Sequence, residues 1–490
     1  MKRIFYSLLA ASMLLAAPVV KADNVTVEQA KQVSVNYLAY YTNLEGLSVN
    51  NLTLVHQWMN EKLNVPSMYI FDVNGGGWAI IAGSTTMDPI VAYSDEGQFP
   101  VDHMAPSLAW WLDNYNQMIC EVQNADASEH FADSKPWKDI IENNIKGSKG
   151  IVNLMPNVKW GQGNDAGTTY NMYCPRVNGV ACVTGCVATA ISQMCYYYKY
   201  PRYSFGYRTY MFNSVPMRVN FTDSAAFDYT IMPNQIKYNT SQAARQEVSR
   251  LCYMVGVAVK MQYGTNAGGG SGAYSQDVPS AMVEYFHFKN GLSPVNRDQV
   301  TNSYYMKIIR NELKSNRVVY MHGASLTGEG NDRSGHAWVC TGYQTDNDNM
   351  YFMNWGWEGD GNSWYNLGGN DMPISGQGYN FNQGQGIIRN FIPPQDSIDI
   401  DVSLAVPEAD EPVVLGAAYP NPATQTVMLP YSTQSTTDLT VYIMIGQPVL
   451  TRSVHAGNGN LEVRVDAMPA GIYIYRMGNA YGKFIVRQEN

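Results

Sequence analysis

A helix that starts at a glycine-cysteine pair is the strongest structural signal in this chain. In VTGCVATAISQMCYYY, residues 183–198, apolar residues recur three and four positions apart, the spacing of one buried helical face. They are Val187, Ala190, Ile191, Met194, Cys195 and Tyr198. Because Gly185 precedes the pattern, we expect the helix to begin at or near Cys186. The unpaired N–H groups and dipole of a helix N-terminus lower the pKa of a thiol, which favours a reactive Cys186.

The other cysteines narrow the possible roles of Cys186. Cys195 would lie about 13 Å further along the same helix, too far for a disulfide, whose Cα atoms lie within about 7 Å. Cys195 is therefore expected in the core. Cys182 precedes the helix and is close enough in sequence to pair with Cys186, so the sequence leaves a Cys182–Cys186 disulfide as an alternative. Zinc is disfavoured because the central cysteines form no CxxC pair and no HxxxH accompanies them, and we expect no metal and no cofactor.

A cysteine nucleophile needs a base, and two distant segments supply the residues for it. SGHAWVCTGY places His336 after a glycine-bearing loop and at the start of an alternating strand. In MYFMNWGWEGDG a second strand ends at Asn354, and Trp355 and Trp357 follow on a glycine turn. The Asn354 amide can accept the imidazole N–H, and the two indoles can exclude water from that bond. The order of cysteine, distant histidine and then asparagine is that of papain-like peptidases.

Attack by a cysteine on a carbonyl group also needs donors for the oxyanion. The backbone N–H of Cys186 is one candidate, and Gln162 in VKWGQGND is the other. The glycine-rich segment GTNAGGGSG contains Ser271 but is followed by no GK[ST], so it is not a phosphate-binding loop.

The two ends of the chain indicate export. The sequence begins MKRIFYSLLAASMLLAAPVVKADN, in which a basic start, an apolar run and small residues predict a signal peptide over residues 1–22. No later segment is apolar enough to span a bilayer, so we expect no transmembrane segment in the mature protein. The formal net charge of -9 and the lack of a basic patch argue against nucleic acid as a partner.

Composition and periodicity divide the remaining chain into four parts. Residues 23–148 carry two amphipathic helices and a pair of strands but no reactive constellation, and end in the exposed, cleavable segment NNIKGSKG. Residues 149–393 hold the candidate site. Residues 394–416 form an acidic, proline-containing linker, and alternating strands over residues 417–490 predict a small β-sandwich.

Five segments between about 160 and 370 resemble the streptopain family of secreted bacterial cysteine peptidases. They are WGQG with YNMYCP, GCVATAISQMCYYYKYP, GVAVKMQYG with GGGSGAYSQDVPSAM, GHAWVCTGY and MNWGWEGDGNSWYNL. The resemblance implies an α+β fold with a papain-like, two-lobed catalytic domain. It implies Cys186 as the nucleophile, His336 as the general base and acid, and Gln162 as the oxyanion donor.

The same resemblance assigns four further residues. Asn354 and Trp355 would orient and shield the histidine, and Ser271 and Gly335 match positions that contact the substrate backbone. The chain departs from the family at NDAGTTYN after Gln162, which is longer than the usual tight turn.

The flanking regions resemble parts of secreted precursors. GGGWAIIAGSTTMDPIVAYSDEGQF resembles the streptopain-type pro-domain, which implies that residues 23–148 act as an intramolecular inhibitor. AYPNPATQTVMLP and MPAGIYIYRM resemble the C-terminal sorting domain of the type IX secretion system, which implies contact with secretion machinery. The expected location is extracellular or at the outer-membrane surface of a bacterium.

These observations predict a secreted cysteine endopeptidase that is made as a zymogen and cleaves protein or peptide substrates. The sequence also allows two alternative functions. A transglutaminase-like acyl transferase shares the cysteine and histidine, although Asn354 stands where that class carries aspartate. A catalytically dead surface-binding protein would use the same scaffold, although its reactive residues are intact.

Overall fold

The computed structural model describes residues 24–124, 136–146, 150–213, 215–324, 335–368, 384–394, 413–434, 436–443, 448–466, 468–477 and 480–487. The expected signal peptide and most of the expected linker lie outside these residues. The chain divides into two compact units, residues 1–399 and 400–490. The first unit contains an N-terminal region, residues 24–146, and a central region, residues 150–394.

The N-terminal region packs helices against an antiparallel sheet. Its elements are α1 (Val27–Tyr41), β1 (Leu52–Asn60), β2 (Val65–Val73), β3 (Trp78–Ala82), β4 (Ile90–Ser94), α2 (Pro106–Asn124) and α3 (Pro136–Ile141). Helix α1 begins at a capping box, in which Thr26 Oγ1 accepts the Gln29 N–H and Gln29 Oε1 accepts the Thr26 N–H. The two amphipathic helices and the strand pair predicted for this region are confirmed.

The central region contains the predicted helix at Cys186 and a larger set of strands. Its helices are α4 (Cys186–Tyr198), α5 (Gln242–Ala258), α6 (Val278–Glu284) and α7 (Asn302–Lys314). Its strands are β5 (Ile151–Asn153), β6 (Arg176–Val177), β7 (Val180–Ala181), β8 (Tyr207–Phe212), β9 (Val215–Asn220), β10 (Ser293–Asn296), β11 (Val319–Ala324), β12 (Gly335–Gln344), β13 (Met350–Asn354), β14 (Ser363–Asn366) and β15 (Gln385–Arg389). Helix α4 packs on β12, which brings the segments of Cys186 and His336 together.

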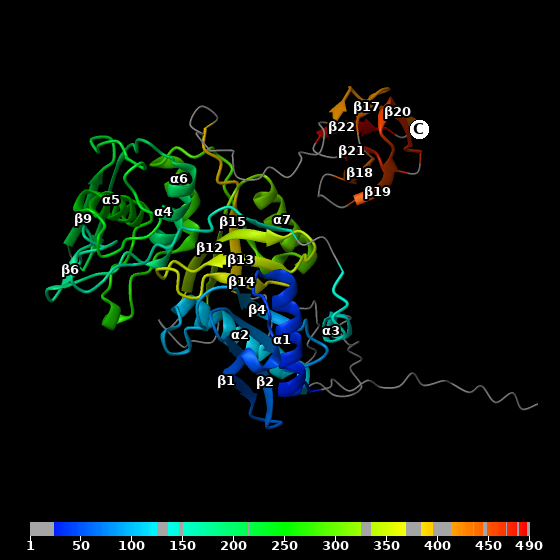
Figure 1. Ribbon diagram of the computed structural model, residues 1–490. Helices are drawn as coiled ribbons and strands as arrows, with labels where there is room; N and C mark the ends of the chain where they lie inside the picture. Colours follow the sequence, from blue (N-terminus) through cyan, green and yellow to red (C-terminus); the bar gives the residue numbers. More distant parts are fainter. Residues whose placement is uncertain are drawn as a thin grey trace, which may run out of the picture. The chain divides into compact units, whose positions relative to one another are not determined.

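One sheet runs through both regions of the first unit. Its strand order is β1-β2-β3-β4-β14-β13-β12-β11-β15-β10, and β5 pairs with β12. The two regions join where Trp364 and Tyr365 of β14 pair with Tyr93 and Ala92 of β4. In Figure 1 helices α4, α5 and α6 lie on one side of β12, and strands β1, β2 and β4 with α1 and α2 lie on the other. The expected boundary near residue 148 therefore falls within one compact unit and stays a prediction.

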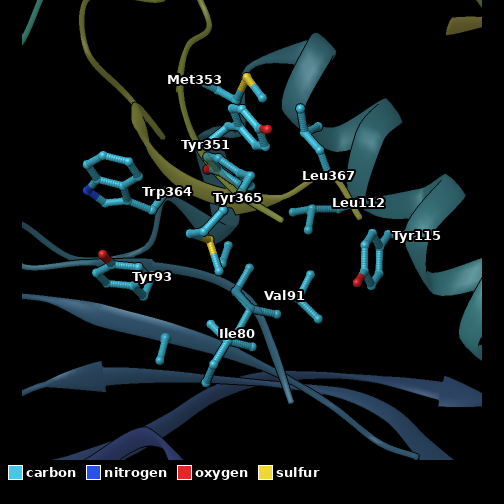
Figure 2. Close-up of a cluster of buried hydrophobic side chains, with 14 of the residues drawn as sticks. Ile80, Val91, Tyr93, Leu112, Tyr115, Tyr351, Met353, Trp364, Tyr365 and Leu367 are labelled. Atoms are coloured by element: carbon cyan, nitrogen blue, oxygen red, sulfur yellow. The ribbon is translucent and has the colours of Figure 1, made fainter. Parts of the chain in front are cut away.

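The junction of the two regions is a shared hydrophobic core. Residues of β3, β4 and α2 belong to the same cluster as residues of β12, β13 and β14. Figure 2 shows part of it, formed by Ile80, Val91, Tyr93, Leu112 and Tyr115 from the N-terminal region and Tyr351, Met353, Trp364, Tyr365 and Leu367 from the central region. The Tyr93 and Trp364 rings stack with centroids 6.3 Å apart. A second cluster lies within the central region, between α4, α5, α6 and the other face of β12.

The described residues of the second unit form β-strands and no helix, as the alternating pattern predicts. Its strands are β16 (Val414–Leu415), β17 (Thr426–Thr433), β18 (Thr437–Ile443), β19 (Pro448–Val454), β20 (Gly457–Arg464), β21 (Gly471–Met477) and β22 (Ala480–Val486). They form one sheet of order β16-β17-β20 and another of order β19-β18-β21-β22, around a core of their own. Among the described residues of the whole chain, no helix combines the length and apolar character needed to cross a membrane.

Candidate active site

Cys186 is the first residue of α4, and Gly185 before it holds the turn into the helix. Gly185 has φ 85° and ψ 146°, a conformation that is rarely open to other residues. A Cβ atom there would lie 2.8 Å from Met261 Sδ and 2.9 Å from the Ser271 carbonyl oxygen. Both the positive φ angle and the close approach of Met261 and Ser271 therefore require glycine immediately before the cysteine.

Replacing Gly185 by alanine is therefore expected to lower kcat/KM by about five- to a hundredfold, because strain of about 1–3 kcal/mol would displace Cys186 and its backbone N–H. The measurement is kcat/KM on a peptide substrate, together with the melting temperature. Gly272→Ala is the matched control, since a Cβ at Gly272 meets nothing within 4 Å. Equal activity of the two variants would contradict this role of Gly185.

The Cys186 thiol faces the backbone of β12. The N–H groups of Ala337, Val187 and Cys186 itself lie close enough to lower its pKa, but burial has the larger effect and raises the pKa of the Cys186 thiol. The helix terminus alone predicts a lowered pKa for this thiol, and this prediction is wrong for the precursor because desolvation outweighs the N–H groups. All seven cysteines are free thiols, and Cys195 is fully buried as predicted.

Gln162 lies against the loop that leads into α4. Its carbonyl oxygen accepts the Thr184 N–H at 2.9 Å, two residues before Cys186. The longer segment after Gln162 is held by buried Asn171, whose Nδ2 donates to Asn164 O at 2.7 Å and to Cys182 O at 2.9 Å. No motif or spacing in the sequence singles out Asn171, which fixes the Gln162 loop to the Cys186 loop.

The glycine-rich loop is also tied to the Cys186 segment. Ser271 Oγ donates to the Val183 carbonyl oxygen at 2.6 Å and accepts the Gly264 N–H at 2.9 Å. The Ser271 hydroxyl is thus engaged within the fold, and its side chain is buried. Gly335 is exposed at the start of β12, where it pairs with Ala324.

His336 follows Gly335 on β12, where it pairs with Gly323 of β11. Side chains alternate along a strand, and Ala337 and Val339 belong to the core around α4, whereas Trp338 and Cys340 belong to the core shared with the N-terminal region. The alternation therefore places His336 on the face opposite Cys186. Among the described residues, no hydrogen bond joins the two side chains.

Trp110 of α2 occupies the space beside His336. A Cβ atom at Gly323, the partner of His336, would lie 2.2 Å from Trp110 Cη2. The Trp110 ring centroid is 6.2 Å from that of Trp338, and Leu108 of the same helix turn packs against Gly361. The apolar periodicity of the sequence predicts α2 but not its contact with β12, because periodicity shows that one face of a helix is buried without showing which segment covers that face.

Asn354 ends β13 beside Val339 of β12 and is fully buried. Its Nδ2 donates to the Val158 carbonyl oxygen at 2.7 Å, and its Oδ1 accepts the Gly356 N–H at 3.1 Å. The structure thus brings Asn354 close to the histidine strand but engages its amide with the backbone rather than with His336. Its expected role in orienting the histidine remains a prediction.

The two expected shielding tryptophans lie in different surroundings. Trp355 is buried, with its ring centroid 5.1 Å from that of Trp338 and 5.2 Å from that of Tyr365. Trp357 is partly exposed and lines a pocket together with Gln162. Trp355 therefore lies on the histidine side of the sheet, and Trp357 lies near the oxyanion candidate.

Three parts of the chain match known protein families. Residues 160–365 match the peptidase C10 family, residues 22–119 match the Spi protease inhibitor family, and residues 417–487 match the secretion system C-terminal sorting domain. The three matches correspond to the central region, the N-terminal region and the second unit.

Individual relatives are similar over about three quarters of the chain. The thiol protease/hemagglutinin PrtT of Porphyromonas gingivalis is 28% identical over 376 residues, which cover 75% of this chain and 41% of PrtT. This chain thus spans less than half the length of that relative. Streptopain of Streptococcus pyogenes is 25% identical over 388 residues, covering 74% of this chain and 91% of streptopain.

A solved structure shares the fold. A fragment of prointerpain A of Prevotella intermedia superposes with a TM-score of 0.55 at 24% sequence identity, and covers 70% of this chain and 99% of that one. The covered part of this chain therefore has the fold of that fragment.

Proposed function

We propose that the chain is a secreted cysteine endopeptidase made as a zymogen, with the central region, whose residues 160–365 match the peptidase C10 family, as its peptidase domain. The observation that carries the proposal is the position of Cys186. It begins a buried helix, and its thiol faces the Ala337 N–H, one residue after His336. From here on, the N-terminal and central regions are called the pro-domain and the peptidase domain.

In the active form, the Cys186 thiolate attacks a substrate carbonyl carbon and forms a carbon–sulfur bond. The Cys186 N–H and Gln162 donate to the oxyanion. Imidazolium His336 gives its proton to the leaving amine as the carbon–nitrogen bond breaks. Water then gives a proton to His336 and attacks the thioester; the carbon–sulfur bond breaks, the carboxylic acid is released, and the Cys186 thiolate and imidazolium His336 are restored.

The pro-domain acts as an intramolecular inhibitor in this proposal. It extends the sheet of the peptidase domain through β4 and places Trp110 beside the position of His336. His336 lies on the pro-domain face of β12, so the general base is separated from the nucleophile in the precursor. Activation then consists of removal of the pro-domain and rearrangement of the histidine end of β12 toward Cys186.

The substrates proposed are proteins and peptides, with no nucleic acid. The sorting domain at residues 417–487 marks the protein as secreted or displayed at the cell surface, and we propose that it contacts the secretion machinery. Asn354 and Trp355 would orient and shield His336 once it has moved, and Ser271 and Gly335 would position the substrate backbone through their main-chain groups.

The test is to express the chain without residues 1–22 and to follow self-processing and casein cleavage. We expect both activities, and we expect iodoacetamide to abolish them while modifying Cys186. Incorporation of an amine into casein in place of hydrolysis would instead support an acyl transferase. A fully processed protein that does neither would support a binding protein on a dead scaffold.

Acidic pH is expected to lower the free energy of unfolding of the zymogen. Burial lowers the pKa of His336 to about 4 and that of His322, on neighbouring β11, also to about 4. In the unfolded chain both imidazoles take up a proton near pH 6.5, whereas in the folded chain they do so only near pH 4. The free energy of unfolding is therefore highest above pH 6.5, as far as these two groups are concerned, and decreases as the pH falls toward about 4.

The measurement is urea unfolding of the Cys186→Ala precursor, whose missing nucleophile prevents self-processing. We expect its midpoint to fall between pH 6.5 and 4, and to fall less when His322→Gln and His336→Gln are added. The same fall with and without these two substitutions would assign the acid sensitivity to other groups.

A further inference from the structure

A pocket of about 190 Å³ opens between three segments of the peptidase domain. Residues 161–163 form one wall, Asn266 of the glycine-rich loop forms a second, and Trp357, Glu358 and Asp360 of the turn after β13 form the third. Gln162, the proposed oxyanion donor, is therefore part of the pocket lining.

This position defines what can enter the pocket, if the proposed function holds. A substrate whose scissile carbonyl oxygen is bound by Gln162 has the two residues that flank the scissile bond next to the pocket. The side chain of one of them is then the group within reach of Trp357, Glu358 and Asp360.

Two carboxylates give the pocket its charge. Among the described residues, no ion pair is formed by Glu358 or by Asp360. Partial burial and the neighbouring Asp360 charge raise the pKa of the Glu358 carboxyl, both side chains are exposed, and no ion pair among the described residues compensates this repulsion. A cation between the two carboxylates would supply that compensation.

The turn that carries Glu358 is held firmly. The Glu358 N–H donates to Trp160 O at 3.0 Å, and Gln235 Nε2 donates to Glu358 O at 2.9 Å. The Glu358 side chain lies flat against Gly161, where a Cβ atom would be 2.4 Å from Glu358 Cγ. A carboxylate on a turn held in this way selects a ligand at lower entropic cost than one on a mobile segment.

Lys159 packs against the same turn but is directed elsewhere in the zymogen. Its stem covers Gly359, where a Cβ atom would lie 2.7 Å from Lys159 Cδ, and its ammonium is 3.6 Å from a carboxylate oxygen of Glu96 in the pro-domain. Release of the pro-domain frees this ammonium, so Lys159 becomes a competitor for the pocket in the mature enzyme.

We propose that this pocket selects a lysine or arginine side chain on a residue directly flanking the scissile bond, with Glu358 and Asp360 as the specificity-determining residues. The aliphatic stem of such a side chain packs on the partly exposed Trp357 indole, and its cation lies between the two carboxylates. Trp357 thereby serves substrate recognition rather than shielding of the histidine.

The test compares self-processed full-chain enzyme with its Glu358→Gln/Asp360→Asn variant on matched fluorogenic peptides. The peptides differ only in having lysine, norleucine or glutamate before the scissile bond, or the same three residues after it. We expect wild-type kcat/KM for lysine to exceed that for norleucine at least about fivefold at one of these positions, and to fall as salt is raised. In the double variant that ratio should fall to about one, while norleucine cleavage is unchanged.

Two further variants complete the design. Asp298→Asn removes an exposed carboxylate that does not line the pocket and should leave the ratio unchanged. Lys159→Met removes the competitor and should raise the ratio. Equal cleavage of lysine and norleucine peptides by wild type, or a preference that survives in the double variant, overturns the pocket assignment alone. A wild type that cleaves none of the peptides and no casein overturns the proposed peptidase function as well.

Discussion

Replacing Cys186 by alanine is expected to abolish self-processing and to reduce casein cleavage by about a thousandfold or more. The substitution removes the sulfur atom that forms the acyl-enzyme, and no neighbouring side chain can replace it, since the other cysteines of the peptidase domain are buried in its core. The change is small in volume and lies at the first residue of α4, so the fold should persist. Gel analysis of precursor and mature bands, together with casein hydrolysis, measures the effect.

Cys195→Ala is the matched control, because it removes the same atoms nine residues further along the same helix. Cys195 is fully buried in the core of the peptidase domain, so we expect a loss of about 1–2 kcal/mol in the free energy of unfolding, with activity per folded molecule retained. A Cys186→Ala protein that matures and cleaves like wild type would contradict the assignment of the nucleophile.

Trp110→Ala in the pro-domain is expected to shorten the lifetime of the zymogen. Trp110 is only 9% exposed and packs against Gly323 and Trp338, next to the position of His336. Truncating a buried tryptophan costs about 3–5 kcal/mol, and even 1.4 kcal/mol of that in pro-domain docking would speed maturation about tenfold. The measurement is the rate at which purified precursor converts to mature enzyme.

Two comparisons separate docking from general instability of the pro-domain. Trp110→Phe keeps an aromatic ring at the contact and should accelerate maturation less. Trp58→Ala removes a partly buried indole from β1, at the far edge of the sheet from β14, and should also have a smaller effect. If Trp58→Ala accelerates maturation as much as Trp110→Ala, the contact beside His336 is not what maintains latency.

Local patterns in the sequence were sufficient to predict the helix and the strands on which the candidate site residues lie. The apolar spacing after Gly185 predicted α4 and its first residue, and alternation predicted the strands that begin near His336 and end at Asn354. The same spacing assigned Cys195 to the core. These features depend on residues within one turn of helix or a few positions of strand, so a single sequence contains them.

The contacts between distant segments could not be predicted in this way. Trp110 lies beside the histidine strand 226 positions later in the chain, and Asn171 links the Gln162 loop to the Cys186 loop. Such pairs depend on the order of strands in the sheet, in particular on the pairing of β4 with β14. No local period in either segment identifies its partner.

By itself, the sequence determined which residues could form a cysteine peptidase site and on which elements they lie, because reactive side chains need particular neighbours along the chain. Only the tertiary structure decided how those residues stand toward one another in the precursor. The alternation of β12 puts His336 on the face that the pro-domain covers, burial raises the pKa of the Cys186 thiol, and the Asn354 amide is engaged by the backbone. Each of these depends on which distant segments pack around the residue and exclude water from it, and that is a property of the folded chain alone.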